Sequence, residues 1–234
     1  MEEFTHIMLD LETMGNRSNS AIVSIAAVPF NLETGEISNG YFFYERIDFQ
    51  SCLDVGLEVQ ASTILWWMQQ NEEARKEICK GGDNIKKVLR RLELYLNSFG
   101  SNFEIWGNGA RFDMGLLQDA YHACSYDKLP WKFGNERDVR TLVSLAPHIK
   151  EQTSNVGVAH NPVDDCIFQI NYCCAIYQHL NNKPQQHYAT PYSPIEINSQ
   201  VPFTVDTPCD VCGCHPNVIV TTHKGTFCLE HVQY

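Results

Sequence analysis

The sequence has little positive charge and no long hydrophobic run. Its 234 residues include 17 lysines and arginines against 28 aspartates and glutamates, which gives a formal net charge of −11. This balance argues against a tight, nonspecific nucleic-acid binder, because such proteins neutralise phosphates with lysine and arginine. No apolar stretch approaches the roughly 20 residues that span a bilayer, and the acidic start at residues 1–4 does not have the form of a signal peptide. We expect a cytoplasmic protein that does not enter membranes.

Hydrophobic residues make up 44% of the chain, enough for one medium domain with its own core and a small appendage. The ten cysteines do not predict a disulfide framework, because a reducing compartment keeps thiols free for packing or for metal. Cys166, Cys173 and Cys174 occur at helical spacing among apolar neighbours, which indicates core positions. Four others gather near the C-terminus and are treated separately below.

Hydrophobic periodicity predicts a first domain of strands and helices. We expect strands over 5–11, 21–30, 37–45 and 103–106, and helices over 62–80, 84–98, 113–124, 139–145 and 165–180. Two short loops join the first three strands, which favours an antiparallel meander. The fourth strand ends in Gly107-Asn108-Gly109, a turn that carries the chain out of the core.

Two acids lie one residue apart in the first predicted strand. In His6-Ile7-Met8-Leu9-Asp10-Leu11-Glu12, side chains alternate between faces, so Asp10 and Glu12 point to the same side. Like charges this close repel each other unless a cation lies between them. For an isolated pair of this kind, an exposed strand end would be the better explanation.

Further acids stand at two predicted helix starts. Asp113 follows the Gly107-Asn108-Gly109 turn, and Asp165 follows His160-Asn161-Pro162-Val163-Asp164. An acid in a first helical turn is also favoured by the helix dipole, and Asp164 is placed to cap the last long helix. Each acid therefore has a structural explanation as well as a catalytic one.

Taken together, Asp-x-Glu on the first strand, Asp after the fourth and His-x-x-x-x-Asp at a late helix resemble the DEDDh exonucleases of the DnaQ-like, ribonuclease H-like superfamily. Over about residues 4–180 the chain is similar to the phage exonuclease A group and its bacterial exoribonuclease relatives. The segments that carry this narrower similarity are Leu11-Glu12-Thr13-Met14-Gly15, Ser62-Thr63-Ile64-Leu65-Trp66-Trp67, Glu73-Ala74-Arg75 and Arg137-Asp138-Val139-Arg140-Thr141.

The resemblance implies an α/β fold with a five-stranded mixed sheet flanked by helices, and removal of nucleotides from the 3′ end of single-stranded DNA or RNA. It also implies two Mg²⁺ or Mn²⁺ ions held by the four acids, with Asp10 bridging them. Their chemistry agrees, because hard divalent cations prefer carboxylate oxygens. His160 suits a general base, since an unperturbed histidine pKa of about 6.5 lets it accept a proton near neutral pH. The His-x-x-x-x-Asp spacing selects Asp165 over Asp164 as the ligand, and Asp164 is expected either to cap the helix or to lie just outside the metal ligands.

Substrate contacts are predicted at five positions. Trp66 could offer a stacking face to a base, although at least one of Trp66 and Trp67 belongs to the core. Arg137 and Arg140 are candidates for phosphate contact or for structural ion pairs, while Asp138 between them suits a helix cap. By the resemblance, Met14 and Gly15 would meet the terminal nucleotide.

The last segment predicts a zinc-binding module. Five prolines occur between residues 181 and 208. They predict a linker over 181–207, between a domain at 1–180 and a module at 208–234. Cys209 and Cys212 form a C-x2-C pair, and Cys228 and His231 form a C-x2-H pair fifteen residues later. This is structural-zinc spacing. The spare candidate ligands are Cys214, His215 and His223.

Only two basic residues, Lys183 and Lys224, follow Leu180, so we favour a structural or protein-contact role for this module. The alternative to an enzyme is a binding protein that keeps a nuclease-like fold without turnover. The sequence leaves the choice of sugar and the oligomeric state open.

Overall fold

The structure, a computed structural model, describes residues 4–38, 40–109, 111–155 and 161–181, and the backbone of 219–222 and 225–228. The chain divides into two compact units, Met1–Ala189 and Thr190–Tyr234. Within the described part of the chain, no helix is long and apolar enough to cross a membrane.

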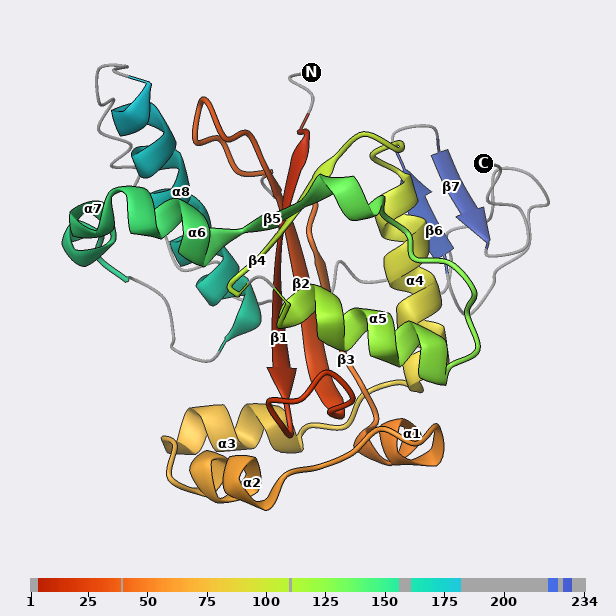
Figure 1. Ribbon diagram of the computed structural model, residues 1–234. Coiled ribbons are helices and arrows are strands. Elements are labelled where there is room, and N and C mark those ends of the chain that lie inside the picture. The colour runs from red at the N-terminus through yellow and green to blue at the C-terminus, as the bar shows by residue number, and fades with distance from the viewer. Residues whose placement is uncertain are drawn as a thin grey trace. The chain divides into compact units, whose positions relative to one another are not determined.

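A five-stranded mixed sheet organises the first unit (Figure 1). Its order is β3-β2-β1-β4-β5, with bounds β1 His6–Thr13, β2 Ile22–Phe30, β3 Phe43–Arg46, β4 Glu104–Gly107 and β5 Glu136–Asp138. The predicted antiparallel meander is confirmed, because β1 pairs antiparallel with β2 and β2 with β3. β4 and β5 continue the sheet in parallel. β1 therefore lies at the centre, where a strand is supported from both sides.

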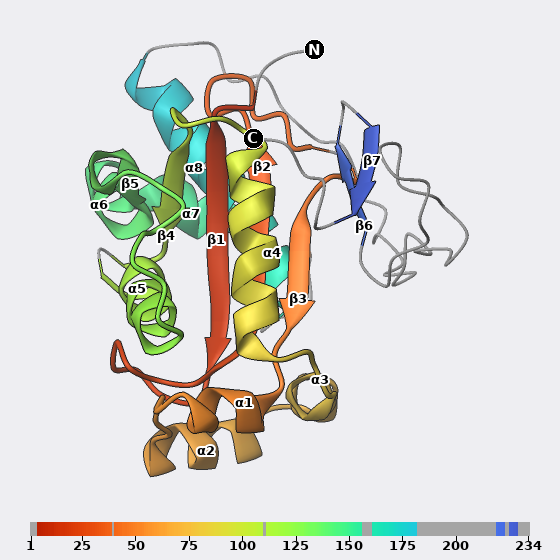
Figure 2. The same ribbon diagram turned by 90° about the vertical axis from the view of Figure 1, so that its right-hand side faces the viewer.

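Helices cover both faces of this sheet, and a hydrophobic cluster lies between the sheet and the helices on each face. The helices are α1 Phe49–Asp54, α2 Ala61–Met68, α3 Glu72–Cys79, α4 Ile85–Asn97, α5 Asp113–Ala123, α6 Val139–Leu145, α7 Pro147–Gln152 and α8 Pro162–Leu180. Figure 2 shows α4 and α8 on opposite sides of β1 and β2.

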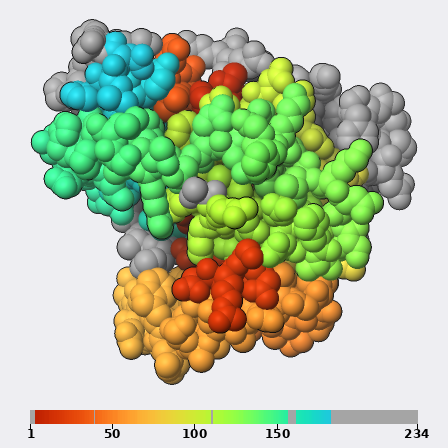
Figure 3. Space-filling view, in the orientation of Figure 1, coloured from red at the N-terminus to blue at the C-terminus, as the bar shows by residue number. Residues whose placement is uncertain are grey.

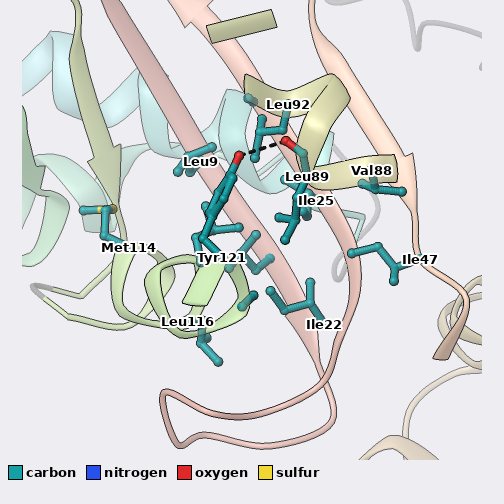
Figure 4. Close-up of a cluster of buried hydrophobic side chains, with 14 of the residues drawn as sticks. Leu9, Ile22, Ile25, Ile47, Val88, Leu89, Leu92, Met114, Leu116 and Tyr121 are labelled. Atoms are coloured by element: carbon teal, nitrogen blue, oxygen red, sulfur yellow. Dashed lines mark hydrogen bonds between the residues drawn. The ribbon is translucent and has the colours of Figure 1, made fainter. Parts of the chain in front are cut away.

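Side-chain alternation along β1 divides these clusters. Ile7, Leu9 and Leu11 pack with α4 and α5, whereas Met8 packs with α8. In the first cluster the buried Tyr121 donates its hydroxyl to Leu89 O, 2.9 Å away, which joins α5 to α4 (Figure 4). Odd-numbered residues of β1 thus face the layer of α4 and α5, and even-numbered residues face α8.

Several element boundaries differ from the sequence-based expectation. The helix expected over 62–80 is two helices, because the Asn71 side chain accepts from Ala74 N and starts α3 anew. The third strand begins only at Phe43, with Ile37 making an isolated bridge to Phe30. The short helices α1 and α7 were not expected, and β5 supplies the fifth strand, which the resemblance implied but the sequence pattern did not locate.

The start of α8 corrects one prediction. The helix begins at Pro162 and is capped by Asn161, whose side chain accepts from Val163 N and Asp164 N. Asp164 is therefore not the cap; it lies in the first turn beside Asp165. Asn161 outcompetes it because a proline at the first helical position places the cap directly before it. The predicted core positions Cys166, Cys173 and Cys174 on this helix are confirmed as buried.

In the second unit the structure describes one antiparallel pair, β6 Ile219–Thr222 and β7 Gly225–Cys228. Their register aligns Ile219 with Cys228 and Thr222 with Gly225.

Candidate active site

Asp10 and Glu12 occupy the last part of β1 on the face that α8 covers. They share the parity of Met8, which belongs to the α8 cluster, and so turn away from the layer of α4 and α5. Glu12 is only 9% exposed, and Asp10 is partly buried. The strand therefore presents both acids on one face, as its sequence predicts, and the structure shows that this face meets α8.

Asp165 reaches these acids from the first turn of α8. The helix packs against β1 and β2, and the Cys166 thiol donates to Met8 O at 3.4 Å, which fixes the helix start to the middle of β1. Ligand oxygens of Asp10, Glu12 and Asp165 all lie within 4.8 Å of one another. Three of the four predicted acids are thus brought together.

Asp113 comes from the opposite layer, at the start of α5. Its Oδ2 accepts from Asn108 N over 2.9 Å, and its side chain is only 2% exposed. A Cβ at Gly107 would lie 2.8 Å from the same oxygen, so the last position of β4 needs glycine. Asp113 lies outside the group of three, although its charge acts on both Asp10 and Glu12.

Burial, together with repulsion by neighbouring acids at Asp10 and Glu12, raises the pKa values of three of the four acids in the metal-free protein. The pKa of Glu12 rises to about 8, first through burial and then through the charges of Asp165 and Asp113. Burial raises the pKa of Asp113 to about 7, and it raises that of Asp10 well above its usual range, with the three other acids adding to the effect. Such a cluster favours either bound protons or bound cations.

The donor set fits divalent cations of the hard type. Carboxylate oxygens are the ligands that Mg²⁺ and Mn²⁺ prefer, and the oxygens converge to within the spacing a cation can bridge. A buried oxygen beside the acids, Gln169 Oε1, also has no hydrogen-bond partner among the described residues. The acids, with this oxygen near them, are therefore suited to a hydrated cation.

Gln169 is a site residue that the sequence analysis missed. It lies four residues after Asp165 in α8, and its Nε2 donates to Asp10 Oδ1 at 3.0 Å. The available signal was the i,i+4 spacing, which places it on the same helix face as Asp165. Without knowing that this face meets β1, the spacing alone assigns no role.

The two tryptophans of α2 have different environments. Trp67 is 3% exposed and donates through Nε1 to Thr13 O at 2.9 Å, whereas Trp66 is 42% exposed. This confirms that one of the pair is core. The contact also sets α2 beside the end of β1, next to Glu12.

Gly15 is buried, and neighbouring side chains leave no room for a Cβ at this position. A Cβ at this position would approach Gln60 Oε1 to 2.8 Å and would collide with the Ser20 side chain. Met14 is partly buried and packs against the α4 and α5 cluster. The loop after β1 is thus held closely against the residues that precede α2.

The two arginines near β5 also differ. Arg137 pairs with Glu104 and donates to the carbonyls of Gly134 and Glu136, which supports the structural alternative. Arg140 is exposed, and its Nε lies 3.4 Å from Asn108 Oδ1, beside the turn that holds Asp113.

Asp138, which precedes α6, caps the helix as expected, and its side chain accepts from Arg140 N and Thr141 N.

Several predicted residues lie outside the described part of the chain. They are His160 and the zinc candidates Cys209, Cys212, Cys214, His215, His223 and His231; of Cys228, the structure describes the backbone in β7 alone.

Figure 3 shows one face of the first unit, on which the red loop that follows β1 lies between the gold helices α2 and α3 and the green helix α5.

Residues 5–177 match the family described as the 3′-5′ exoribonuclease Rv2179c-like domain. The chain belongs to this family. It is therefore a metal-dependent 3′-5′ exonuclease of the DEDDh class in the DnaQ-like superfamily, as the four-acid pattern predicted.

A phage protein is also similar to this chain. The exodeoxyribonuclease of Enterobacteria phage T4 is 25% identical over 222 residues, which cover 80% of this chain and 96% of that protein.

Two solved structures share the fold at low identity. The Mg²⁺- and Mn²⁺-bound form of S. pombe Pop2p has a TM-score of 0.55 at 12% identity, covering 79% of this chain and 87% of that one. The rAMP-bound nuclease domain of 3′hExo, a DEDDh family member, has a TM-score of 0.51 at 13% identity, covering 77% and 94%. The mixed sheet flanked by helices is thus a ribonuclease H-like nuclease fold.

Proposed function

We propose that this exonuclease hydrolyses the terminal phosphodiester bond at the 3′ end of single-stranded DNA or RNA with two Mg²⁺ or Mn²⁺ ions. The ligands are the four acids Asp10, Glu12, Asp113 and Asp165. The observation that carries the proposal is the convergence of Asp10, Glu12 and Asp165 oxygens within 4.8 Å from two separate elements. Asp113 supplies the fourth carboxylate from the start of α5.

When bound, a pair of divalent cations stabilises the attacking and the leaving oxygen of an in-line displacement. Asp10, whose carboxylate feels the charges of the three other acids, would contribute ligand oxygens to this pair. His160 accepts the proton of the attacking water, a role for which an unperturbed pKa of about 6.5 is suited at neutral pH. Its position five residues before Asp165 motivates this assignment.

Substrate binding uses the surface around the end of β1. Trp66 presents a partly exposed ring on α2, where a base can stack, and Trp67 holds that helix next to Glu12. Arg140 provides an exposed positive charge near the turn that holds Asp113. Met14 and Gly15, in the loop after β1, contact the terminal nucleotide.

The names of the relatives point to different sugars. The family is described as exoribonuclease, and the phage protein as exodeoxyribonuclease. Both polymers therefore belong in the test of this proposal.

The experiment compares single-stranded DNA and RNA labelled at either end, in Mn²⁺ and in EDTA. A 3′ label should be released as a mononucleotide at once, and a 5′ label should move down a ladder of shortening products. Hydrolysis only in the presence of the cation, and none by Asp10→Asn, would support the proposal. Equal cleavage in EDTA would contradict the cation chemistry, and release of the 5′ label first would contradict the direction.

Two neighbouring acids provide a matched pair of variants. Asp165→Asn should abolish hydrolysis, because removal of a metal ligand removes several kcal/mol of charge stabilisation. Asp164→Asn changes the same charge one residue away and should keep most of the activity. The reverse result would mean that Asp164 is the ligand.

For the rest of the chain we propose a linker over 181–207 and a zinc module over 208–234. The module holds one Zn²⁺ through Cys209, Cys212, Cys228 and His231 and serves as a structural or protein-contact element. The support is the ligand spacing in the sequence.

A further inference from the structure

Gln169 is a buried polar side chain between α8 and the acids of β1. It is 4% exposed, its Nε2 donates to Asp10 Oδ1 at 3.0 Å, and its Oε1 is buried without a partner among the described residues. A buried amide without a full set of partners costs free energy, and an apolar side chain of similar length would avoid that cost. A simple packing role therefore does not explain this glutamine.

The orientation of the amide follows from its neighbour. A carboxylate accepts hydrogen bonds and cannot donate, so the Nε2 group must face Asp10 while that acid is ionised. This places Oε1 on the other side of the amide, where it can only accept. The partner that completes the side chain is thus a hydrogen-bond donor in the vicinity of the acids.

Helix geometry links Gln169 to the cation ligands. Asp165 and Gln169 are separated by one helical turn and lie on the same face of α8. Asp165 joins the group of converging oxygens, and Gln169 holds an oxygen of Asp10 in the same group. One face of α8 therefore provides the ligand Asp165 and, through Gln169, a hydrogen bond to the ligand Asp10 on β1.

We infer that Gln169 is a positioning residue, which orients the Asp10 carboxylate for divalent cation binding and accepts a hydrogen bond from the cation's hydration water through Oε1. The inference rests on the proposed cation site. A carboxylate has about four acceptor positions, so the bond to Nε2 leaves room for cations on Asp10. Outer hydrogen bonds of this kind tune metal affinity by fixing the ligand's orientation.

The same helix contains a matched control. Gln178 is also buried, at 5% exposure, and its Nε2 donates to Glu33 O at 3.0 Å. It makes a hydrogen bond of the same length but to a backbone carbonyl rather than to an acid. Replacing either glutamine with methionine removes one buried amide and keeps an unbranched side chain of similar length.

The experiment measures Mn²⁺ affinity by calorimetry and thermal unfolding in EDTA for wild type, Gln169→Met, Gln178→Met and Asp10→Asn in the full chain. Gln169→Met should weaken Mn²⁺ binding by roughly 10–100-fold, in the range of outer-ligand substitutions. Gln178→Met should leave Mn²⁺ affinity within about twofold of wild type, as expected for a site it does not touch. Saturating Mn²⁺ should restore most of the kcat of Gln169→Met.

Unchanged affinity in Gln169→Met would overturn the inference, and so would equal weakening in both glutamine variants. If Gln169→Met does not fold, Gln169→Asn provides the test, because it keeps the amide but is one methylene too short to hold Asp10; wild-type affinity in this variant would also overturn the inference. If wild type itself binds no Mn²⁺, or Asp10→Asn binds as well as wild type, the proposed cation site fails. That outcome differs from one in which wild type binds Mn²⁺ and Gln169→Met binds it equally well, which overturns only the inference about Gln169.

Discussion

Trp67 Nε1 donates a hydrogen bond to Thr13 O, 2.9 Å away, and so joins α2 to β1 one residue beyond Glu12. This contact positions an otherwise exposed helix beside the acids. It also separates the roles of two adjacent tryptophans, because Trp66 remains 42% exposed.

The tryptophan pair yields opposite expectations. Trp67→Phe should lower the free energy of unfolding by about 1–3 kcal/mol, because it leaves a buried carbonyl without its donor. Trp66→Ala should change stability little but raise the KM for oligonucleotides, since stacking on an aromatic contributes about 1–3 kcal/mol per base. Urea unfolding and steady-state kinetics measure the two effects. An unchanged KM in Trp66→Ala would remove this residue from the substrate site.

Metal-free stability should fall as the pH rises. Glu12 has a usual pKa of 4.5 and a folded-state pKa of about 8. Below pH 4.5 both the folded and the unfolded state keep the proton. Between these values the unfolded state releases it first, so the folded state loses stability until about pH 8. The Tm in EDTA should therefore decline over this window, and Asp10 and Asp113 act in the same direction.

Glu12→Gln tests this dependence, because the difference between the variant and wild type cancels the effect of other titrating groups. The Tm of the variant in EDTA should depend less on pH, and Mn²⁺ should raise the Tm of wild type more at pH 8 than at pH 6. Identical pH profiles for the two proteins would contradict the raised pKa of Glu12.

His160→Ala should slow hydrolysis by roughly 10²–10⁴-fold, the usual range for a positioned general base. Mn²⁺ affinity should survive, because the four acids remain. Single-turnover rates and calorimetry separate these effects, and His148→Ala on α7 is the control for loss of a histidine. A full rate in His160→Ala would assign the base to another group.

Cys228→Ser should release one zinc ion while Mn²⁺-dependent nuclease activity persists. Thiolates hold zinc tightly, whereas the carboxylates exchange Mg²⁺ or Mn²⁺, so the two sites should fail independently. Elemental analysis of wild type, this variant and Cys79→Ser, which alters an exposed cysteine of α3, measures the effect. Equal zinc in all three proteins, or none in wild type, would contradict the zinc assignment.

Local patterns predicted the long elements well. Asn84 caps α4 and Ser98 ends it, at the two limits of the predicted helix, and α6 spans the predicted 139–145. β5 was missed because a half-buried edge strand of three residues shows no alternation long enough to read. The start of α8 was misplaced because Asn161 and Asp164 are both good caps, and the choice depended on Pro162.

The sequence by itself determined that Asp10 and Glu12 share a face, because the two-residue period of a strand needs no knowledge of the rest of the fold. It also identified Asp113 and Asp165 as acids at helix starts. Only the tertiary structure decided which helix meets that face, and hence that Gln169 holds Asp10 and that Trp67 holds α2 beside Glu12. The physical reason is that periodicity specifies the direction of a side chain, whereas its partner depends on how distant segments pack.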